Sequence, residues 1–403
     1  MRFVIVFLAV VYAAFFGAAF SAPQESFDQF LVGFEKKALS AGIPKTVYRA
    51  ATKGLKPDPS IKVSQGNQPE FEKPVWSYLD QRITADRIKR GRSAFGKNEA
   101  LFNRVGKAYG VDPYMLAAIW GVETDYGAIM NNDRYFKPVL RSLFSLVHQR
   151  RGRVKLDEAE LIAALKIYAR GEAPASGLKG SWAGALGHLQ IMPSAFLTHG
   201  TDFDGDGKRD PHGSLGDALA SSAKWLLGVG YQPGQDWGYE VDLPKGFDYM
   251  LAGRTQLRPI SFFAERGVTR VKRRKFGDLD EQVFLYVPAG AGGPKFLMTQ
   301  NYLALKGYNF ADSYALAVAH LTDRLKGAGP FVNSWPRQAK FLNRQQRIEP
   351  QKRLMKLGFY ADKLDGRFGP ISQDALRQWQ KRHGHLADGF ATIGVYNSVM
   401  NSN

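Results

Sequence analysis

The sequence contains no cysteine among its 403 residues. Disulfide bridges are therefore excluded, and the folded state must rely on apolar cores, which a hydrophobic content of 44% can supply. A lipid anchor on a cysteine is excluded for the same reason. Acidic residues are also scarce, with 37 Asp and Glu against 55 Lys and Arg and a formal net charge of +18 at pH 7. This charge favours an anionic partner: nucleic acid, a membrane surface or an acidic polymer.

Long apolar runs are absent beyond residue 20, so no later segment has the uninterrupted apolar length of a transmembrane helix. The one such run, 3–20, follows Arg2 and ends in small residues at 19–22, which is typical of an export signal. We therefore expect a signal segment over residues 1–22 and a folded part outside the cytoplasm. The alternative is an uncleaved membrane anchor, since the run approaches the length that spans a bilayer. Membrane attachment is expected only in that case.

Export argues against nucleic acid as the anionic partner. The basic residues are also scattered along the chain rather than gathered in one arm. A nucleic-acid binder would explain the charge but not the signal segment, and its binding would have to be sensitive to salt. An anionic cell-wall polymer is therefore the expected partner, and nucleic acid is not.

Most of the chain up to residue 330 has a helical pattern, so the fold class is expected to be mainly α. Apolar residues recur at three- and four-residue spacing in 156–169 and 312–325. Two short apolar runs, 260–263 and 282–287, resemble strands and predict a small sheet that interrupts the helical body.

The length of the chain predicts at least two folded units. After Gly327, Gly and Pro residues interrupt the helical spacing of apolar residues, and a basic polar stretch follows. Residues 347–403 have apolar residues and turn signals of their own, and this length could form a small three-helix module. The expected divisions are an export signal at 1–22, a main domain at 23–330, a linker at 331–346 and a small module at 347–403.

The most informative segment contains one carboxylate on an apolar helix. Asp112 and Pro113 predict the N-cap and first residue of this helix, and Gly127 predicts its end. Leu116, Ile119 or Trp120, and Glu123 are three, four and seven residues apart, which places them on one face of a helix. Glu123 is therefore expected on the apolar stripe that faces inward.

Burial of Glu123 would raise the pKa of its carboxyl and favour the protonated form near neutral pH. A general acid needs that form to protonate a glycosidic oxygen. The alternative is a buried glutamate paired with an arginine for structural reasons, and these residues alone do not separate the two. Asp125 is expected on a different side of the helix, as a solvated residue.

The segment 181–194 sets polar side chains among small residues. Small residues allow a ligand to approach the backbone closely, and Ser181 and Gln190 could bond the acetamido and hydroxyl groups of a sugar. The alternative is a tight packing turn between helices, which is preferred if the segment is taken alone. His188 by itself is expected to be a hydrogen-bonded structural histidine.

An acidic loop follows this segment. Asp202, Asp204 and Asp206 are spaced two apart and Gly207 is sixth, which is the opening of a calcium-binding loop whose seventh residue, Lys208, offers its backbone carbonyl. The usual glutamate at the twelfth position is missing, because Gly213 occupies it. The loop predicts a structural Ca²⁺ site, and the alternative is a turn without an ion.

Taken together, several motifs resemble the membrane-bound lytic transglycosylase B family of peptidoglycan enzymes. The resemblance covers roughly residues 27–327, and its motifs lie at 68–71, 76–79, 120–127, 181–194 and 308–309. It implies a lysozyme-like catalytic domain with a small β-containing insertion.

The resemblance also implies roles for individual residues. Glu123 matches the catalytic glutamate, and Ser181, Gln190, Tyr308 and Asn309 match positions that line the saccharide groove. Asp217 matches the carboxylate that closes the calcium loop.

The implied reaction cleaves the β-1,4 bond between N-acetylmuramic acid and N-acetylglucosamine and forms 1,6-anhydro-N-acetylmuramic acid. No catalytic cofactor is expected. The protein would act as a monomer on peptidoglycan in the periplasm of a bacterium. The alternatives are a muramidase that hydrolyses the same bond and a non-catalytic cell-wall-binding protein.

The C-terminal module contains motifs at 357–360, 364–370 and 374–380 that resemble the small peptidoglycan-binding domain of many wall enzymes. Asp365 and Gly366 predict a turn, and Trp379 is expected in the core of the module rather than on a ligand. The implied role is avidity, since the module would hold the catalytic domain near an insoluble polymer.

Overall fold

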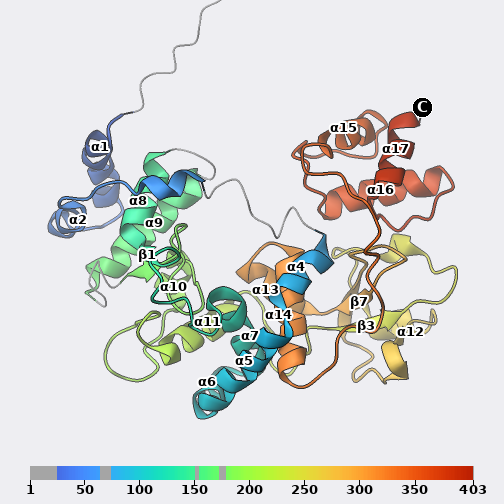
Figure 1. Cartoon of the computed structure of the whole chain (residues 1–403), viewed down its shortest axis with the longest axis horizontal. Helices are drawn as coiled ribbons and strands as arrows, with labels where there is room; N and C mark the ends of the chain where they lie inside the picture. The colour runs from blue at the N-terminus through green and yellow to red at the C-terminus, as the bar shows by residue number, and fades with distance from the viewer. Residues whose placement is uncertain (1–24, 64–73, 150–153, 172–177, 403) are drawn as a thin grey trace, which may run out of the picture.

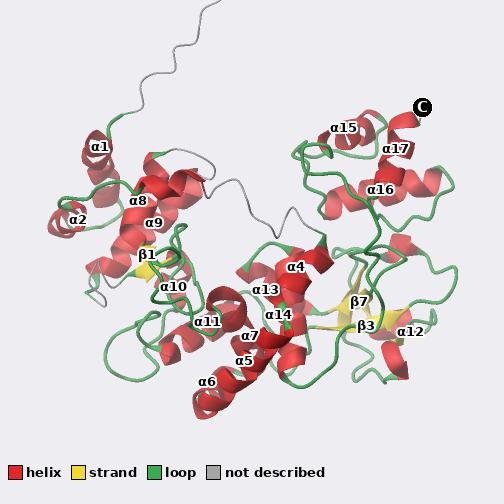
Figure 2. Cartoon of the chain, viewed as in Figure 1, coloured by secondary structure: helices red, strands yellow, loops and turns green. Residues whose placement is uncertain are grey.

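The computed structural model describes residues 25–63, 74–149, 154–171 and 178–402. The expected export signal and the 68–71 motif lie outside these residues. Helices dominate the architecture and strands are confined to two small sheets (Figure 2). The mainly α fold class is therefore confirmed. Within the described part of the chain, no helix has the length and apolar character needed to cross a membrane.

The N-terminal lobe packs helices from two separate stretches of the chain around one aromatic core (Figure 1). The ring of Phe144 lies 6.0 Å from that of Phe34, which in turn lies 5.6 Å from that of Phe30. The predicted helix at 156–169 is confirmed within a slightly longer one. The elements of this lobe are α1 (Phe27–Ser40), α2 (Lys45–Thr52), η1 (Pro59–Val63), β1 (Lys137–Pro138), α8 (Val139–His148), α9 (Val154–Ala169), β2 (Lys179–Gly180) and α10 (Pro193–His199).

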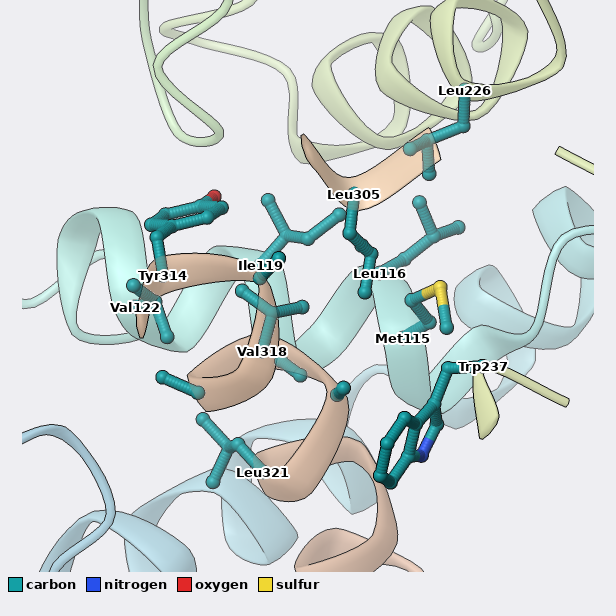
Figure 3. Close-up of a cluster of buried hydrophobic side chains, with 14 of the residues drawn as sticks. Met115, Leu116, Ile119, Val122, Leu226, Trp237, Leu305, Tyr314, Val318 and Leu321 are labelled. Carbon is teal, nitrogen blue, oxygen red and sulfur yellow. The ribbon is translucent and has the colours of Figure 1, made fainter. Parts of the chain in front are cut away.

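The central body surrounds α7 (Pro113–Thr124), in which nine of twelve residues are buried. A helix covered on nearly all sides is apolar all round rather than amphipathic. Figure 3 shows Leu116, Ile119 and Val318 in the core that α7 shares with α14. The other helices of this body are α4 (Val75–Arg82), α5 (Ala85–Lys97), α6 (Glu99–Tyr109), α11 (Leu215–Gly228), α13 (Gln300–Tyr308) and α14 (Asp312–Leu325). The prediction for 312–325 is confirmed.

A five-stranded antiparallel sheet in the order β4-β6-β7-β3-β5 adjoins the central body. The strand predicted at 282–287 is confirmed for all but its last residue, whereas the strand predicted at 260–263 is wrong. That segment forms a helix, because Ile260 and Phe263 are both fully buried and lie three residues apart, on one helical face. The elements are β3 (Gly238–Asp242), η2 (Tyr249–Leu251), β4 (Arg258–Pro259), α12 (Ile260–Ala264), β5 (Thr269–Arg270), η3 (Val271–Arg273), β6 (Gln282–Tyr286) and β7 (Lys295–Met298).

The C-terminal module consists of α15 (Ile348–Lys356), α16 (Pro370–Arg382) and α17 (Ile393–Asn401). Its core includes Leu354, Leu376 and Trp379. The expected three-helix module is therefore confirmed. Trp379 is 1% exposed and belongs to the core of the module, as expected from the sequence.

Candidate active site

Glu123 lies on the last turn of α7, one residue before the helix ends. Asp112 is the N-cap, since its Oδ1 accepts a hydrogen bond from Tyr114 N at 2.9 Å, and Pro113 is the first helical residue, as predicted. The helix ends three residues before Gly127, because Asp125 and Tyr126 already have positive φ angles of 53° and 60°. The helical backbone therefore ends directly after the candidate acid.

The Glu123 carboxylate is half-buried and is held by a tyrosine from another helix. Tyr314 Oη, from α14, donates to Glu123 Oε1 at 2.5 Å, and Tyr314 is 2% exposed. Burial, and after it the charge of Glu123, raises the pKa of the Tyr314 hydroxyl well above its usual value. The hydroxyl therefore stays protonated and acts as a donor, which orients the carboxylate and stabilises its charged form.

Asp125 is not the solvated residue that the sequence suggested. Its carboxylate pairs with Arg87 Nε at 3.1 Å and with Arg90 Nη2 at 2.9 Å, both from α5, and its side chain is 24% exposed. The left-handed backbone at Asp125 accounts for the error, because it turns the side chain away from where a continuing helix would place it. These ion pairs fix the end of the helix that carries Glu123.

The segment 181–194 folds into tight turns with close backbone contacts. Ser181 N donates to Ala185 O at 2.9 Å, and Ser181 Oγ accepts from Ala185 N at 3.2 Å. A Cβ on Gly180 would lie 1.8 Å from Ala185 O, and one on Gly187 would lie 1.9 Å from Pro211 O. These two glycines therefore serve backbone packing within the protein, as the packing-turn alternative requires.

Gln190 sits at a strained corner of the same segment. Its φ is 52°, a region that residues other than glycine seldom occupy, and its Nε2 donates to Gly187 O at 2.8 Å. The preceding residue, Leu189, accepts a hydrogen bond through its carbonyl from Tyr308 Oη at 2.7 Å. Strained backbone of this kind clusters at functional sites, where the surrounding structure enforces it.

Tyr308 connects this corner to Glu123. Burial, and then the charge of Glu123, raises the pKa of Tyr308 above its usual value, so the two groups are electrostatic neighbours. Its hydroxyl lies 3.0 Å from Ser222 Oγ and is already bonded to Leu189. The half-buried Asn309 uses its Oδ1 to accept from Ala311 N at 3.0 Å, just before α14 begins.

His188 ties the 181–194 segment to α7. Its Nδ1 accepts a hydrogen bond from Trp120 Nε1 at 3.2 Å, and its carbonyl accepts from Thr124 Oγ1 at 2.7 Å. Burial lowers the pKa of the imidazole to about 4, so the ring is neutral near pH 7. This hydrogen-bonded structural role is the one that the sequence suggested.

Sequence reasoning missed Tyr314, which it placed only among the apolar residues of a helix. A buried tyrosine hydroxyl normally requires a polar partner, so a tyrosine on a deeply buried helix was the available signal. The identity of that partner depends on how α14 packs against α7.

The acidic loop brings together three of its four predicted carboxylates. Oxygens of Asp202, Asp204 and Asp217 lie within 4.8 Å of one another, whereas the exposed Asp206 is not part of this cluster among the residues that the structure describes. Asp217 is 1% exposed and accepts from Phe203 N at 2.8 Å and Asp210 N at 2.9 Å. Burial nevertheless raises the pKa of Asp217. A bound cation would offset that cost, and hard carboxylate oxygens suit calcium.

Two sequence families match the chain. The family described as Transglycosylase SLT domain matches residues 26–323, and a peptidoglycan-binding domain matches residues 343–397. Among curated proteins, the membrane-bound lytic murein transglycosylase B of Escherichia coli (strain K12) is 29% identical over 249 residues. The match covers 60% of this chain and 65% of that relative, just under two thirds of its length.

Solved structures of transglycosylases have the same fold. SltB3 from Pseudomonas aeruginosa, in complex with NAG-anhNAM-pentapeptide, is 40% identical with a TM-score of 0.87, and the match covers 94% of this chain and 100% of that one. The lytic transglycosylase Slt35 of Escherichia coli, in complex with calcium, is 25% identical with a TM-score of 0.61, and the match covers 76% of this chain and 94% of that one. Because the SLT domain spans well over half of the sequence and is followed by a peptidoglycan-binding domain, this chain belongs to the SLT family of peptidoglycan lytic transglycosylases.

Proposed function

We propose that this protein cleaves the β-1,4 bond between N-acetylmuramic acid and N-acetylglucosamine in peptidoglycan and forms a 1,6-anhydro ring, with Glu123 as both acid and base. The observation that carries this assignment is the half-buried Glu123 carboxylate, held at 2.5 Å by the hydroxyl of Tyr314. Most glycosidases use two carboxyls, but substrate-assisted enzymes are an exception. A single oriented glutamate is the arrangement that such a mechanism requires.

The two steps return Glu123 to its starting state. Protonated Glu123 first donates its proton to the glycosidic oxygen, the bond from C1 of the muramic acid to that oxygen breaks, and the substrate's own acetamido oxygen stabilises the positive charge at C1. The Glu123 carboxylate then accepts the proton of the C6 hydroxyl while O6 bonds to C1. One proton leaves the glutamate and one returns, and no water is consumed. The enzyme is therefore a lyase rather than a hydrolase.

Tyr314 is a positioning residue in this scheme. Its hydrogen bond holds the carboxylate in one orientation and favours the charged form that the second step needs. Its role would be exerted through Glu123.

The saccharide groove is proposed to include Ser181, Gln190, Tyr308 and Asn309. Ser181 and Gln190 offer donors and acceptors to acetamido and hydroxyl groups of the sugar. The hydroxyl of Tyr308 is already used by the carbonyl of Leu189, so Tyr308 would act by fixing the strained corner at Gln190.

A structural calcium ion is proposed for the acidic loop. Asp202, Asp204 and Asp217 would supply carboxylate oxygens and Lys208 its backbone carbonyl. Asp206, the fourth predicted carboxylate, is exposed and would be an additional ligand. The ion would hold the loop to the start of α11 and would take no part in the reaction.

We further propose that residues 1–22 direct export, that 23–330 form the catalytic domain, and that 331–346 connect it to a peptidoglycan-binding domain at 347–403. The protein would act as a monomer on peptidoglycan in the periplasm. Export of the folded part is the condition for reaching this substrate.

Mass spectrometry of the muropeptides released from purified peptidoglycan tests the proposal. The mature protein is expected to release anhydro-muramyl products and the Glu123→Gln variant none. Glu99→Gln, an exposed first-turn residue of α6, is the matched control and should keep the activity. Reducing-end products would make the enzyme a muramidase. An absence of products from the mature protein itself would support a wall-binding role.

A further inference from the structure

Three residues in a row have a left-handed backbone immediately after the helix that carries Glu123. Asp125, Tyr126 and Gly127 have φ angles of 53°, 60° and 82°. Glycine adopts this region at no steric cost, and aspartate occurs there more often than most residues, whereas a bulky residue such as Tyr126 is strained. The side chains at 125 and 126 must therefore make contacts that offset the strain, and strain enforced in this way clusters at functional sites.

The ring of Tyr126 fills a slot between α5 and α7, which lie side by side (Figure 1). A Cβ on Gly91 of α5 would lie 2.2 Å from Tyr126 Oη, and a Cβ on Gly121 of α7 would lie 2.5 Å from Tyr126 Cζ. The ring also meets Trp120 edge-on, with 5.8 Å between the ring centroids. Both helices therefore have a glycine where the ring passes, and the ring holds the turn against α5.

Asp125 ties the same turn to α5 through two arginines. Its Oδ1 accepts a hydrogen bond from Arg87 Nε at 3.1 Å, and both of its carboxylate oxygens accept from Arg90 Nη2, at 2.9 and 3.0 Å. The arginines are themselves held in place, because Arg87 Nη1 donates to Arg82 O at 3.1 Å and Arg90 pairs with Asp86. Asp125, Arg87 and Arg90 thus form an ion-pair cluster that holds the turn after α7.

The turn also packs against the 181–194 segment. A Cβ on Gly127 would lie 3.3 Å from His188 and 3.4 Å from Trp120, and these two side chains are joined by the hydrogen bond from Trp120 Nε1 to His188 Nδ1 at 3.2 Å. The turn therefore contacts both α5 and the segment that contains Gln190. A displacement of the turn would be transmitted to Glu123, which lies only two residues before Asp125.

We propose that Asp125 is a positioning residue for the cleavage reaction. With Arg87 and Arg90 it holds the turn after α7, and this turn fixes the backbone from which Glu123 projects. Tyr314 Oη holds the carboxylate itself at 2.5 Å, so the backbone and the carboxylate of Glu123 are held by separate contacts. The inference rests on the proposed function, and the role of Asp125 is exerted through Glu123.

The ion pairs also offset the charge of Asp125 in the neighbourhood of Glu123. An uncompensated anion near a carboxyl raises its pKa, and an uncompensated cation lowers it. The ionisable groups that face Glu123 from α14 and α13 are Tyr314 and Tyr308. Burial raises the pKa of both hydroxyls, so they remain neutral near pH 7. Substitutions in the ion-pair cluster therefore change the charge near Glu123 while these tyrosines stay neutral.

Steady-state kinetics of the full chain on soluble peptidoglycan fragments, with anhydro products as the readout, test the role of Asp125. Asp125→Asn keeps the left-handed backbone, which asparagine tolerates, and removes the charge. Arg87→Gln removes the opposite charge, and the double variant contains neither. Each single variant is expected to lower kcat about tenfold and to leave KM within about twofold, because the acid loses its orientation while the sugar contacts remain. The double variant should lose no more than the single variants, since the two residues act as a unit.

The pH profile separates this role from a general loss of packing. A unit charge about 10 Å from a titrating group in a partly solvated site shifts its pKa by about half a unit. Asp125→Asn leaves cations without their carboxylate, so the alkaline limb of kcat/KM should move to lower pH by about that amount. Arg87→Gln should move the limb to higher pH, and the double variant should return it to its original position. A loss of packing alone would not reverse the sign between the two single variants.

Glu35→Gln is the matched control, because the Glu35 side chain is 23% exposed, against 24% for Asp125, and pairs with Arg49 at 3.3 Å in the N-terminal lobe. Its kcat, KM and pH profile should equal those of the unsubstituted protein. Melting temperatures measured under the assay conditions ensure that the kinetics report folded protein. The double variant, whose charges balance, is assayed in place of a single variant that melts below the assay temperature, and a tenfold loss of kcat in it has the same meaning.

Three results would overturn the proposal: a kcat within about twofold of the unsubstituted protein in the variants of the ion-pair cluster, a loss confined to KM, or alkaline limbs that stay in place or move in the same direction in both single variants. The failure of the proposed function would look different, since the unsubstituted protein would then release no anhydro products.

Discussion

Replacing Tyr314 with phenylalanine removes one oxygen atom, the donor that lies 2.5 Å from Glu123 Oε1. A hydrogen bond to a charged group contributes about 1.5–3 kcal/mol, so its loss disfavours the Glu123 carboxylate relative to its protonated form by that amount. Each pH unit corresponds to about 1.4 kcal/mol. The alkaline limb of the kcat/KM profile, where the acid loses its proton, should therefore move to higher pH by about one to two units.

The maximal rate should fall as well, by roughly tenfold or more, because the carboxylate loses the contact that orients it. The assay is the pH dependence of anhydro-muropeptide release by the purified full chain. An alkaline limb that stays in place, or that moves to lower pH, would refute the argument that Tyr314 stabilises the charged form.

Tyr48→Phe provides the control for deleting a buried tyrosine hydroxyl. Tyr48 is 2% exposed, and its hydroxyl donates to Leu31 O at 2.7 Å in the N-terminal lobe. This variant should lose about 1 kcal/mol of stability and keep the pH profile of the unsubstituted protein. A shifted profile in Tyr48→Phe would mean that the shift reports general loosening and not the contact with Glu123.

Calcium at a concentration about a hundredfold above Kd should stabilise the folded protein by about 3 kcal/mol and so raise its melting temperature. Asp217→Asn should abolish that rise. Identical melting curves in calcium and in chelator would exclude the site. Gly91→Ala should destabilise the fold by about 1–3 kcal/mol, because the added Cβ would lie 2.2 Å from Tyr126 Oη. In the same helix, a Cβ added at Gly96 would have no heavy atom within 4 Å, so Gly96→Ala should stabilise the fold by about 0.5–1 kcal/mol. Denaturant titration measures both, and similar effects would contradict this packing argument. Burial lowers the pKa of His320 from 6.5 to about 3, so the unfolded chain binds more protons between these values. The contribution of His320 to the free energy of unfolding is therefore fully present above pH 6.5 and is lost as the pH falls. The loss reaches about 3 kcal/mol near pH 4. His320→Gln should flatten the slope of unfolding free energy against pH in this range, and an unchanged slope would contradict the assignment.

Several elements were predictable because their signals are local. Asp112 with Pro113 marked the start of α7, since capping and proline preferences act within one turn. The apolar spacing at 312–325 matched α14, and Trp379 was placed correctly in the core of the module. In each case the neighbouring residues alone carry the physical preference.

Other features were decided by distant contacts. The apolar run 260–263 fits a strand or a helix equally well, and burial of Ile260 and Phe263 on the same side selects the helix. Asp125 was expected in solvent because its ion pairs with α5 depend on a left-handed backbone that the sequence did not reveal. The contacts that the predicted linker, 331–346, makes with β3 and α4 also depend on residues far away in sequence.

The sequence by itself determined the mainly helical class, the family and the position of Glu123, because these follow from periodicity and from motifs within single segments. Only the tertiary structure decided what surrounds that glutamate. Tyr314 is 191 residues away along the chain and reaches it through the packing of α14 on α7. A cavity lined by residues from 74 to 396 also gathers side chains from segments that are far apart in sequence. Local preferences choose helices and turns, whereas the chemistry of a site depends on which distant side chains share the same small volume.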